Sequence, residues 1–340
     1  MAATALHHRS VMTERSLFWS RAAEGIPPHA WFGVSAVFHY LGPSFAVLLF
    51  PALGVVGVAW IRIASAAAVF ALWTRPWRTL RLIDGQTRLL LIALGACLAV
   101  MNTAFYLALD RLPMSLVAAI EFVGTIGLAL YGLRTSRNLL ALVLAAGGVV
   151  LLLDAKWSSD LVGLCCAFLN GALFVGYIVL GHKISERGAS EGVERLGAAM
   201  AIAFLFVTPI GFYRAMTAFG SIDLVLAGVG VGICSSVIPY VCDQLAMSRL
   251  PRSSFALLLA LLPAAATVMG VIVLAQIPSV RNVVGVLLVM LGVALHKPAR
   301  STTRAQAPQS DSPVRDGGFR PLQRTGILAV SAPRIGSERK

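Results

Sequence analysis

The sequence predicts an all-α integral membrane protein with ten transmembrane helices in two inverted five-helix repeats. Three observations predict it: the apolar composition, the spacing of the apolar runs and an internal repeat. Hydrophobic residues make up 58% of the 340 residues and charged residues only 13%, and the mean hydropathy is +0.81. A soluble domain with so few charges could not cover its surface with polar groups. The composition therefore excludes a soluble enzyme, a nucleic-acid-binding domain and a disordered chain.

Ten apolar runs, bounded by glycine, proline or charged residues, approach the length of about 20 residues that a spanning helix needs. The expected spans are 31–51, 54–73, 89–109, 113–132, 138–154, 161–181, 196–213, 224–243, 251–274 and 281–296. We expect 1–29 to be a cytoplasmic N-terminal segment that is not cleaved, and 298–340 to be a disordered basic cytoplasmic tail.

The net charge of +13 is distributed as expected for a membrane protein, not for a nucleic-acid-binding one. If the N-terminus and every second loop share one side, the short loops on that side hold eleven Lys and Arg residues, against four on the other. Basic loops stay in the cytoplasm. We therefore expect a multi-pass protein of the inner (plasma) membrane with both termini cytoplasmic.

An internal repeat divides the membrane part into 30–154 and 155–297. The motif Arg-Leu-Pro-x-Ser at 111–115 recurs at 249–253, and Arg-Asn at 137–138 recurs at 281–282, each at the start of a span. Because each unit has five helices, an odd number, the second unit must be inverted relative to the first. Inverted repeats with a binding site at their interface are typical of secondary transporters. The alternative is a chance match of short motifs.

The sequence resembles the EamA-type drug/metabolite transporter superfamily, and within it the threonine/homoserine exporter branch. The resemblance runs from about 42 to 294. The residues that carry it are Leu49-Phe50-Pro51 with Gly54, Arg62, Pro76-Trp77-Arg78, Met101-Asn102, Phe105-Tyr106-Leu107, Ile120-Glu121-Phe122 with Gly124, Pro239-Tyr240 and Arg249-Leu250-Pro251. The resemblance implies ten helices in two inverted halves, and export of amino acids or related small metabolites.

The chain departs from this family pattern in its second half. Where the family has Glu-Pro, this chain has Leu262-Pro263, and where the family often has Gly-Glu, it has Ala275-Gln276. Two acidic positions are therefore replaced. The first half also has Thr125 in place of Pro and Val47 in place of a frequent Lys.

Two charged residues within the expected spans are the main candidates for transport chemistry. Glu121 is the only carboxylate in the middle of a span, and Arg62 lies at a similar depth, about 12 Å from the same face at 1.5 Å per residue. Ionisable groups at this depth are costly and usually functional. We expect both to bind substrate and Glu121 to couple transport to protons. The alternative is a buried ion pair that only fixes helix packing.

Three uncharged residues are further substrate-binding candidates. Asn102 and Asn170 reach a similar depth and could bind a substrate or hold helices together. Tyr106 follows Asn102 by one helical turn and shares its face. Tyr106 and Tyr177 could instead be anchors at the membrane interface.

Asp243 and Pro263 are the candidate gate residues. Asp243 ends the expected eighth span on the cytoplasmic side, where it could guard the inner mouth or cap a helix among the headgroups. Pro263 removes a backbone hydrogen bond within the ninth span and permits a kink. His39 could carry a proton, although a neutral packed histidine is the simpler interpretation. The five cysteines are interpreted as small packing residues.

The pattern favours a secondary carrier that exports small polar metabolites, with proton antiport as one way to drive it. It has no nucleotide-binding loop, no metal-ligand spacing and no motif for a cofactor. The expected partners are a small-molecule substrate and the lipid bilayer, with no nucleic acid, and a homodimer is compatible with the sequence. The alternatives are an integral-membrane enzyme, a non-transporting scaffold and a permease that works with a separate ATPase.

The charge bias predicts which loops are accessible from outside. A cysteine placed at Ser158 should react with an impermeant thiol reagent added to intact cells, whereas a cysteine at Gly188 should react only after the membrane is opened. The reverse labelling pattern would overturn the expected topology.

Overall fold

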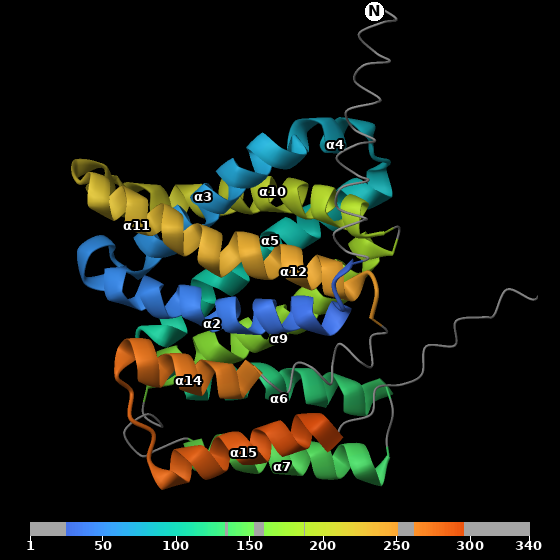
Figure 1. Cartoon of the computed structure of the whole chain (residues 1–340), viewed down its shortest axis with the longest axis vertical. Helices are drawn as coiled ribbons and strands as arrows, with labels where there is room; N and C mark the ends of the chain where they lie inside the picture. Colours follow the sequence, from blue (N-terminus) through green and yellow to red (C-terminus); the bar gives the residue numbers. More distant parts are fainter. Residues whose placement is uncertain (1–24, 133–134, 153–159, 187, 251–261, 296–340) are drawn as a thin grey trace, which may run out of the picture. The chain divides into compact units, whose positions relative to one another are not determined.

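The computed structural model describes residues 25–132, 135–152, 160–186, 188–250 and 262–295, and every element in these ranges is helical. The helices are α2 (Pro28–Leu53), α3 (Val55–Thr74), α4 (Pro76–Leu82), α5 (Gly85–Leu109), α6 (Met114–Gly132), α7 (Ser136–Leu152), α9 (Leu161–Ser185), α10 (Ala189–Ala215), η1 (Met216–Gly220), α11 (Ile222–Gly232), η2 (Ile233–Val237), α12 (Ile238–Met247), α14 (Leu262–Leu274) and α15 (Val280–Leu295) (Figure 1).

Most of these helices have the length and composition of membrane-spanning segments. Within the described residues, six are long and apolar enough to cross a membrane, and four further apolar helices are shorter. The all-helical class and the membrane location are thus as predicted. Most of the N-terminal segment, the tail 298–340 and the first part of the ninth expected span, 251–261, lie outside the described residues.

One helix starts earlier than hydropathy alone predicted. The seventh span was expected from residue 196, whereas α10 begins at Ala189. Its first two turns are polar, and Arg195 forms an ion pair with Glu191 one turn earlier. Arg195 also donates to the Ile184 carbonyl at 3.3 Å, which fastens α10 to the end of α9. Side-chain pairs one turn apart support a helical turn that has no apolar face.

The eighth expected span is interrupted in its middle. It consists of α11, a π-helical turn (η2) and α12, and Pro239 lies in the first turn of α12. Proline has no N–H to donate to the carbonyl four residues earlier, which here belongs to Ser235. The wider π turn places this carbonyl at the point where α2 and α3 approach the segment. A Cβ on Gly42 would lie 2.6 Å from the Ser235 backbone nitrogen.

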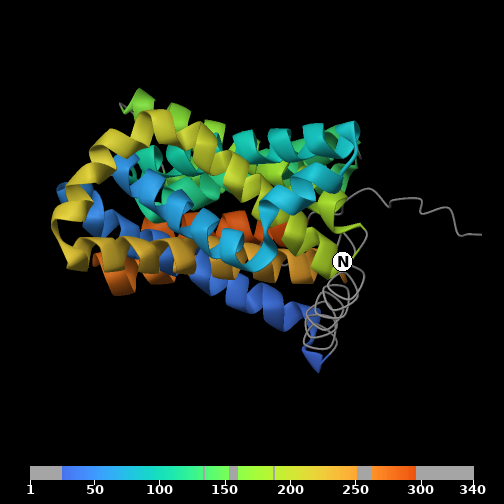
Figure 2. The same ribbon diagram turned by 90° about the horizontal axis from the view of Figure 1, so that it is seen from above.

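The helices pack in pairs that join distant parts of the chain. The closest pairs are α3 with α10 and α7 with α15, and Figure 1 shows α7 and α15 side by side at one edge of the bundle. Helix α5 also packs on α9 and α10, α2 packs on α12 and α14, and α6 packs on α7 and α9. Figure 2, which views the bundle from above, shows that most helix axes are roughly aligned with one another.

An aspartate caps the start of α5. Asp84 accepts hydrogen bonds from the backbone nitrogens of Gln86 and Thr87 at 3.1 and 3.2 Å and from the Thr87 hydroxyl at 2.6 Å. These bonds satisfy backbone donors that a helix start leaves unpaired. The hydrogen bonds from Thr87 lower the pKa of the exposed Asp84 carboxyl, so the cap remains ionised at neutral pH.

Small residues set the closest approach of α7 and α15. A Cβ on Gly148 would lie 2.5 Å from the Gly285 carbonyl oxygen, and a Cβ on Gly292 would lie 2.6 Å from the Ala141 carbonyl oxygen. Backbone atoms on both sides leave no flexible side chain to move aside. Helices in lipid depend on such close packing because no hydrophobic force drives them together.

This contact predicts different outcomes at two neighbouring glycines. Gly148→Ala should lower the free energy of unfolding by about 1–3 kcal/mol, because the added methyl group overlaps backbone atoms of α15. Gly147→Ala is the matched control, since nothing lies within 4 Å of its Cβ position. Thermal unfolding of both variants in detergent measures the difference. Equal stability of the two variants would contradict this packing.

Candidate functional site

Arg62 lies in the interior, where it joins α3 to the interrupted eighth span. Its side chain is 3% exposed. Nε donates to the Ser236 hydroxyl at 2.8 Å, and Nη2 donates to the Ser235 carbonyl at 2.7 Å. This carbonyl is the one that Pro239 leaves without a helical partner. Pro239 leaves the Ser235 carbonyl without a helical donor, and Arg62 supplies a donor in its place.

The guanidinium keeps one nitrogen available. Nη1 of Arg62 is buried and has no hydrogen-bond partner among the described residues. The guanidinium carbon lies 5.0 Å from the centre of the Tyr106 ring, a cation–π distance. The Tyr106 hydroxyl is likewise buried without a partner in the described part of the chain. Two neighbouring residues thus each present an unpaired polar group in the interior.

Asn102 forms the next part of this polar interior. Its Nδ2 donates to the Leu98 carbonyl at 2.7 Å, and its Oδ1 accepts from the Tyr240 hydroxyl at 3.0 Å. The contact ties α5 to α12 at the residue directly after Pro239. Asn102 and Tyr106 lie on one face of α5, as their spacing predicted, and both are buried.

Glu121 lies on α6 and is 2% exposed. Its Oε2 accepts a hydrogen bond from the Tyr40 hydroxyl at 3.3 Å. Asn170 of α9 lies beside this carboxylate, although its Nδ2 makes no hydrogen bond of good geometry within the described residues. The close approach of the helices depends on Gly171, where a Cβ would lie 3.1 Å from the Glu121 Cα.

A second buried carboxylate, Asp243, lies on α12 and is 4% exposed. Oδ1 accepts from the Ser35 hydroxyl at 2.5 Å, and Oδ2 accepts from the Tyr177 hydroxyl at 3.0 Å. Ser35 also approaches the Pro239 carbonyl at 3.2 Å. Because α12 continues to Met247, Asp243 lies inside the bundle and does not cap a helix among the headgroups.

The structure brings some of the predicted site residues together and separates others. Arg62 and Tyr106 are in contact, and Glu121 lies beside Asn170. Arg62 and Glu121 do not form an ion pair within the described residues, although Arg62 lies within electrostatic range of Glu121. Pro263 is a buried residue in the first described turn of α14.

Sequence reasoning missed the residues whose hydroxyl or carbonyl groups bind these buried polar side chains. The partners of Arg62, Asn102, Glu121 and Asp243 are Ser35, Tyr40, Tyr177, Ser235, Ser236 and Tyr240. Tyr177, which could have been an interface anchor, is fully buried, as is Tyr106. Only the Ser235 carbonyl could have been identified from the sequence. It lies four residues before Pro239, which has no N–H, so it needs a donor from outside its own helix.

The described cysteines are all free. Cys97 and Cys242 are buried, as expected for packing residues, whereas Cys165 is exposed and lies outside that interpretation. Among the described residues, no group of three or more His, Cys, Asp or Glu side chains could hold a metal ion.

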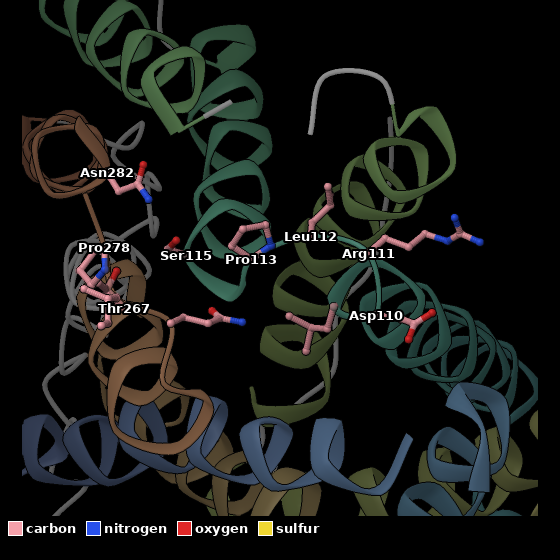
Figure 3. A pocket seen from close by; sticks show the side chains of 11 residues that line it. Asp110, Arg111, Leu112, Pro113, Ser115, Thr267, Pro278 and Asn282 are labelled. Carbon is pink, nitrogen blue, oxygen red and sulfur yellow. The ribbon is translucent and has the colours of Figure 1, made fainter. Parts of the chain in front are cut away.

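A separate pocket of about 460 Å³ lies where the chain turns from α5 to α6, at the end of the bundle expected to face outside. Figure 3 shows Thr267, Pro278 and Asn282 across the opening from Pro113 and Ser115. The side chains of Asp110 and Arg111 extend away from these residues (Figure 3), and Arg111 lies 3.6 Å from Asp160. Asp110 and Arg111 still line the pocket, together with neutral polar groups and apolar surface.

One hydrogen bond crosses the rim of this pocket. The Met114 backbone nitrogen, at the start of α6, donates to Gln276 Oε1 at 3.3 Å. Gln276 follows Ala275, whose φ of 52° is in the left-handed region. These are the two positions where the chain has Ala-Gln in place of Gly-Glu. An amide oxygen can accept this bond without adding a charge to the pocket.

Comparison with known proteins places these features in a family. The chain is 34% identical over 238 residues to the threonine/homoserine exporter RhtA of Escherichia coli strain K12, a match that covers 69% of this chain and 79% of the relative. It is 33% identical over the same length to RhtA of Salmonella typhimurium strain LT2. Residues 161–296 match the EamA-like transporter family. The chain belongs to the EamA-like transporter family.

A solved structure supports the fold of this EamA-family chain. A crystal structure with 18% sequence identity superposes with a TM-score of 0.54, covering 78% of this chain and 95% of the other. At this identity the likeness concerns the fold alone. The family resemblance predicted from the motifs around Arg62, Glu121 and Arg249 is therefore confirmed, and the chain is a multi-pass membrane protein of a transporter family.

The contacts of Arg62 predict how this EamA-family chain tolerates a lysine. Arg62→Lys keeps the charge but loses one of the two hydrogen bonds and the planar group over Tyr106. A charged hydrogen bond contributes about 1.5–3 kcal/mol, so the free energy of unfolding should fall by about that amount.

The matched control is Arg78→Lys, at an exposed position of α4. Thermal unfolding in detergent should separate the two variants. If Arg62→Lys is as stable as Arg78→Lys, these contacts do not stabilise the protein.

Proposed function

We propose that this chain is a secondary carrier that exports small polar metabolites, amino acids or amino-acid-like compounds such as threonine and homoserine, across the inner membrane by proton antiport. The observation that carries the proposal is the buried guanidinium of Arg62 over the Tyr106 ring, where neither Nη1 nor the Tyr106 hydroxyl has a hydrogen-bond partner within the described residues. An ionisable group held this deep in a membrane helix usually serves a substrate or ion pathway. The names of the RhtA relatives point to the same substrate class.

The helix contacts support ten helices in two inverted units, 30–154 and 155–297. If each helix of one unit is exchanged for its counterpart in the other, the contact of α5 with α9 becomes that of α12 with α2, and α6 with α9 becomes α14 with α2. The pairs α3–α10 and α7–α15 each exchange into themselves. Such exchange is what a two-fold axis between inverted repeats requires.

The interior has the groups that a zwitterionic amino acid needs. Its carboxylate would accept hydrogen bonds from Arg62 Nη1 and the Tyr106 hydroxyl, since an arginine binds carboxylates with several N–H donors. Its ammonium would lie at the ionised Glu121, which is within electrostatic range of Arg62. Asn102 and Asn170 would bind the remaining polar atoms. Protonation of Glu121 would then release the ammonium and link export to proton entry.

Counterflow in proteoliposomes tests the carrier. Liposomes loaded with unlabelled threonine or homoserine should take up the labelled compound transiently, without any imposed gradient of pH. Other amino acids and metabolites in the same panel measure the specificity. If the folded protein exchanges no member of the panel, the carrier proposal fails.

A single substitution tests the role of Glu121 in coupling. Glu121→Gln imitates the protonated acid and cannot release a proton, so accumulation driven by a pH gradient should disappear. The matched control is Glu186→Gln, which changes an exposed carboxylate after α9. Accumulation that persists in Glu121→Gln would mean that coupling resides on another group or does not occur.

A further inference from the structure

We infer that Asp243 is a second proton-binding site of the transport cycle and that it exchanges a proton with Glu121. The inference rests on the proposed proton antiport and adds a second carboxylate to it. It starts from the likeness of the two acids. Both are nearly fully buried, and each accepts a hydrogen bond from a tyrosine hydroxyl, Tyr40 for Glu121 and Tyr177 for Asp243.

Neither carboxylate is held by a basic side chain in the described part of the chain. The ion pairs there involve Arg111 with Asp160 and Arg195 with Glu191. A buried carboxylate with a basic partner is fixed in its ionised form, whereas hydroxyl partners can serve either protonation state, because a hydroxyl both donates and accepts. Hydroxyl partners therefore suit groups that change protonation during a cycle.

The two acids are flanked by the same two helices. On α2, Ser35 binds Asp243 and Tyr40 binds Glu121, and the two positions are five residues apart. On α9, Asn170 lies beside Glu121 and Tyr177 binds Asp243, seven residues or two turns later. At 1.5 Å per residue the two acids are separated by about 10 Å along the helices, with Asp243 nearer the expected cytoplasmic end.

Aromatic rings and one histidine fill the interval between them. His39 packs edge-on against Tyr40 at 5.6 Å and against Tyr240 at 6.4 Å, measured between ring centres. Tyr240 in turn lies 5.3 Å from Tyr177. The His39 ring nitrogens make no hydrogen bond within the described residues, and the side chain is only partly buried. His39 thus lies between the tyrosine that binds Glu121 and Tyr240, which packs on the tyrosine that binds Asp243.

The charged and titratable groups around this interval come from few helices. Arg62 of α3 lies within electrostatic range of both Glu121 and His39. Around Asp243 they are Tyr177 of α9, with Tyr240 and Cys242 of its own helix. On α10, which also packs on α12, Arg195 is engaged by Glu191 and the Ile184 carbonyl.

The step moves one proton and no other group. A protonated Glu121 loses its proton and becomes a carboxylate, able to bind the ammonium of the next substrate. The proton passes across the interval between the two acids to the Asp243 carboxylate. Asp243 becomes a neutral acid and then releases the proton to the cytoplasm. Charge is conserved at every stage, and no oxidant or other co-reactant is needed.

Infrared difference spectroscopy of the full-length protein in lipid tests whether Asp243 takes up a proton. Acidification to about pH 5, at which exposed carboxylates are still mostly ionised, should produce two bands of protonated carboxyl groups in the wild type. Asp243→Asn should lack one of these bands and Glu121→Gln the other. The matched control Asp223→Asn, at an exposed position in the first turn of α11, should retain both. An Asp243→Asn spectrum identical to the wild type would overturn the inference.

Transport separates a proton site from a purely structural carboxylate. Asp243→Asn should retain threonine counterflow but lose accumulation driven by a pH gradient. Loss of counterflow in a folded variant, or wild-type accumulation, would each overturn the inference. Failure of wild-type counterflow would instead refute the proposed function. The infrared titration needs no substrate and would still decide whether Asp243 binds a proton.

A second variant covers the case in which Asp243→Asn does not fold. Tyr177→Phe leaves the carboxyl in place and removes one hydrogen bond to Oδ2. If Asp243 titrates, the band assigned to it should change frequency and appear at a different pH, while the Glu121 band stays unchanged. A spectrum and pH profile equal to those of the wild type would show that the group does not take part.

Discussion

The interior of this transporter depends on how a buried arginine is accommodated in a membrane helix. Removing an ionised group from water is costly, and the charge is tolerated only where hydrogen bonds replace its hydration. Arg62 obtains two of them from one turn of the eighth span, at the Ser235 carbonyl and the Ser236 hydroxyl. Removing one partner of a buried charge typically costs about 3–5 kcal/mol, so this contact constrains both helices.

That constraint determines the shape of the neighbouring helices. Pro239 frees the carbonyl that Arg62 uses, and the π turn before it displaces the backbone towards α2 and α3. Gly42 and Gly232 allow both helices to approach, because a side chain at either position would overlap Ser235 or the backbone of Arg62. An irregular backbone within a membrane is tolerated only where protein or an aqueous cavity covers it. The irregular turn and the buried charge therefore lie at the same point of the bundle, where each satisfies the other's hydrogen bonds.

The two carboxylates follow a different rule from the arginine. Glu121 and Asp243 are paired with hydroxyl groups. A hydroxyl can donate a hydrogen bond to a carboxylate and can accept one from a protonated carboxyl group. Arg62 stays charged under all physiological conditions, so a fixed set of acceptors suits it. A permanent cation and two acids with hydroxyl partners are consistent with the proposed antiport.

The sequence alone determined the class, the membrane location and the family of this protein. Hydropathy is a sum over many residues, so an error at a few positions does not change the predicted class. The motifs around Arg62, Glu121 and Arg249 identified the family, which the RhtA relatives confirm. It also identified Glu121 and Arg62 as exceptional, because a charge in an apolar run is visible without a structure. The start of α10 was missed, since an ion pair within a helix gives no hydropathy signal.

Only the tertiary structure decided which polar groups meet. Tyr40 and Glu121 are 81 residues apart, and Ser35 and Asp243 are 208 apart, so no local pattern could pair them. Serine and tyrosine are common in membrane helices, and their sequence positions do not reveal whether they face lipid, another helix or the interior. The expected pairing of Arg62 with Glu121 rested on equal depth along the membrane. Depth is one coordinate, whereas contact also requires the rotation of each helix about its axis, which packing sets.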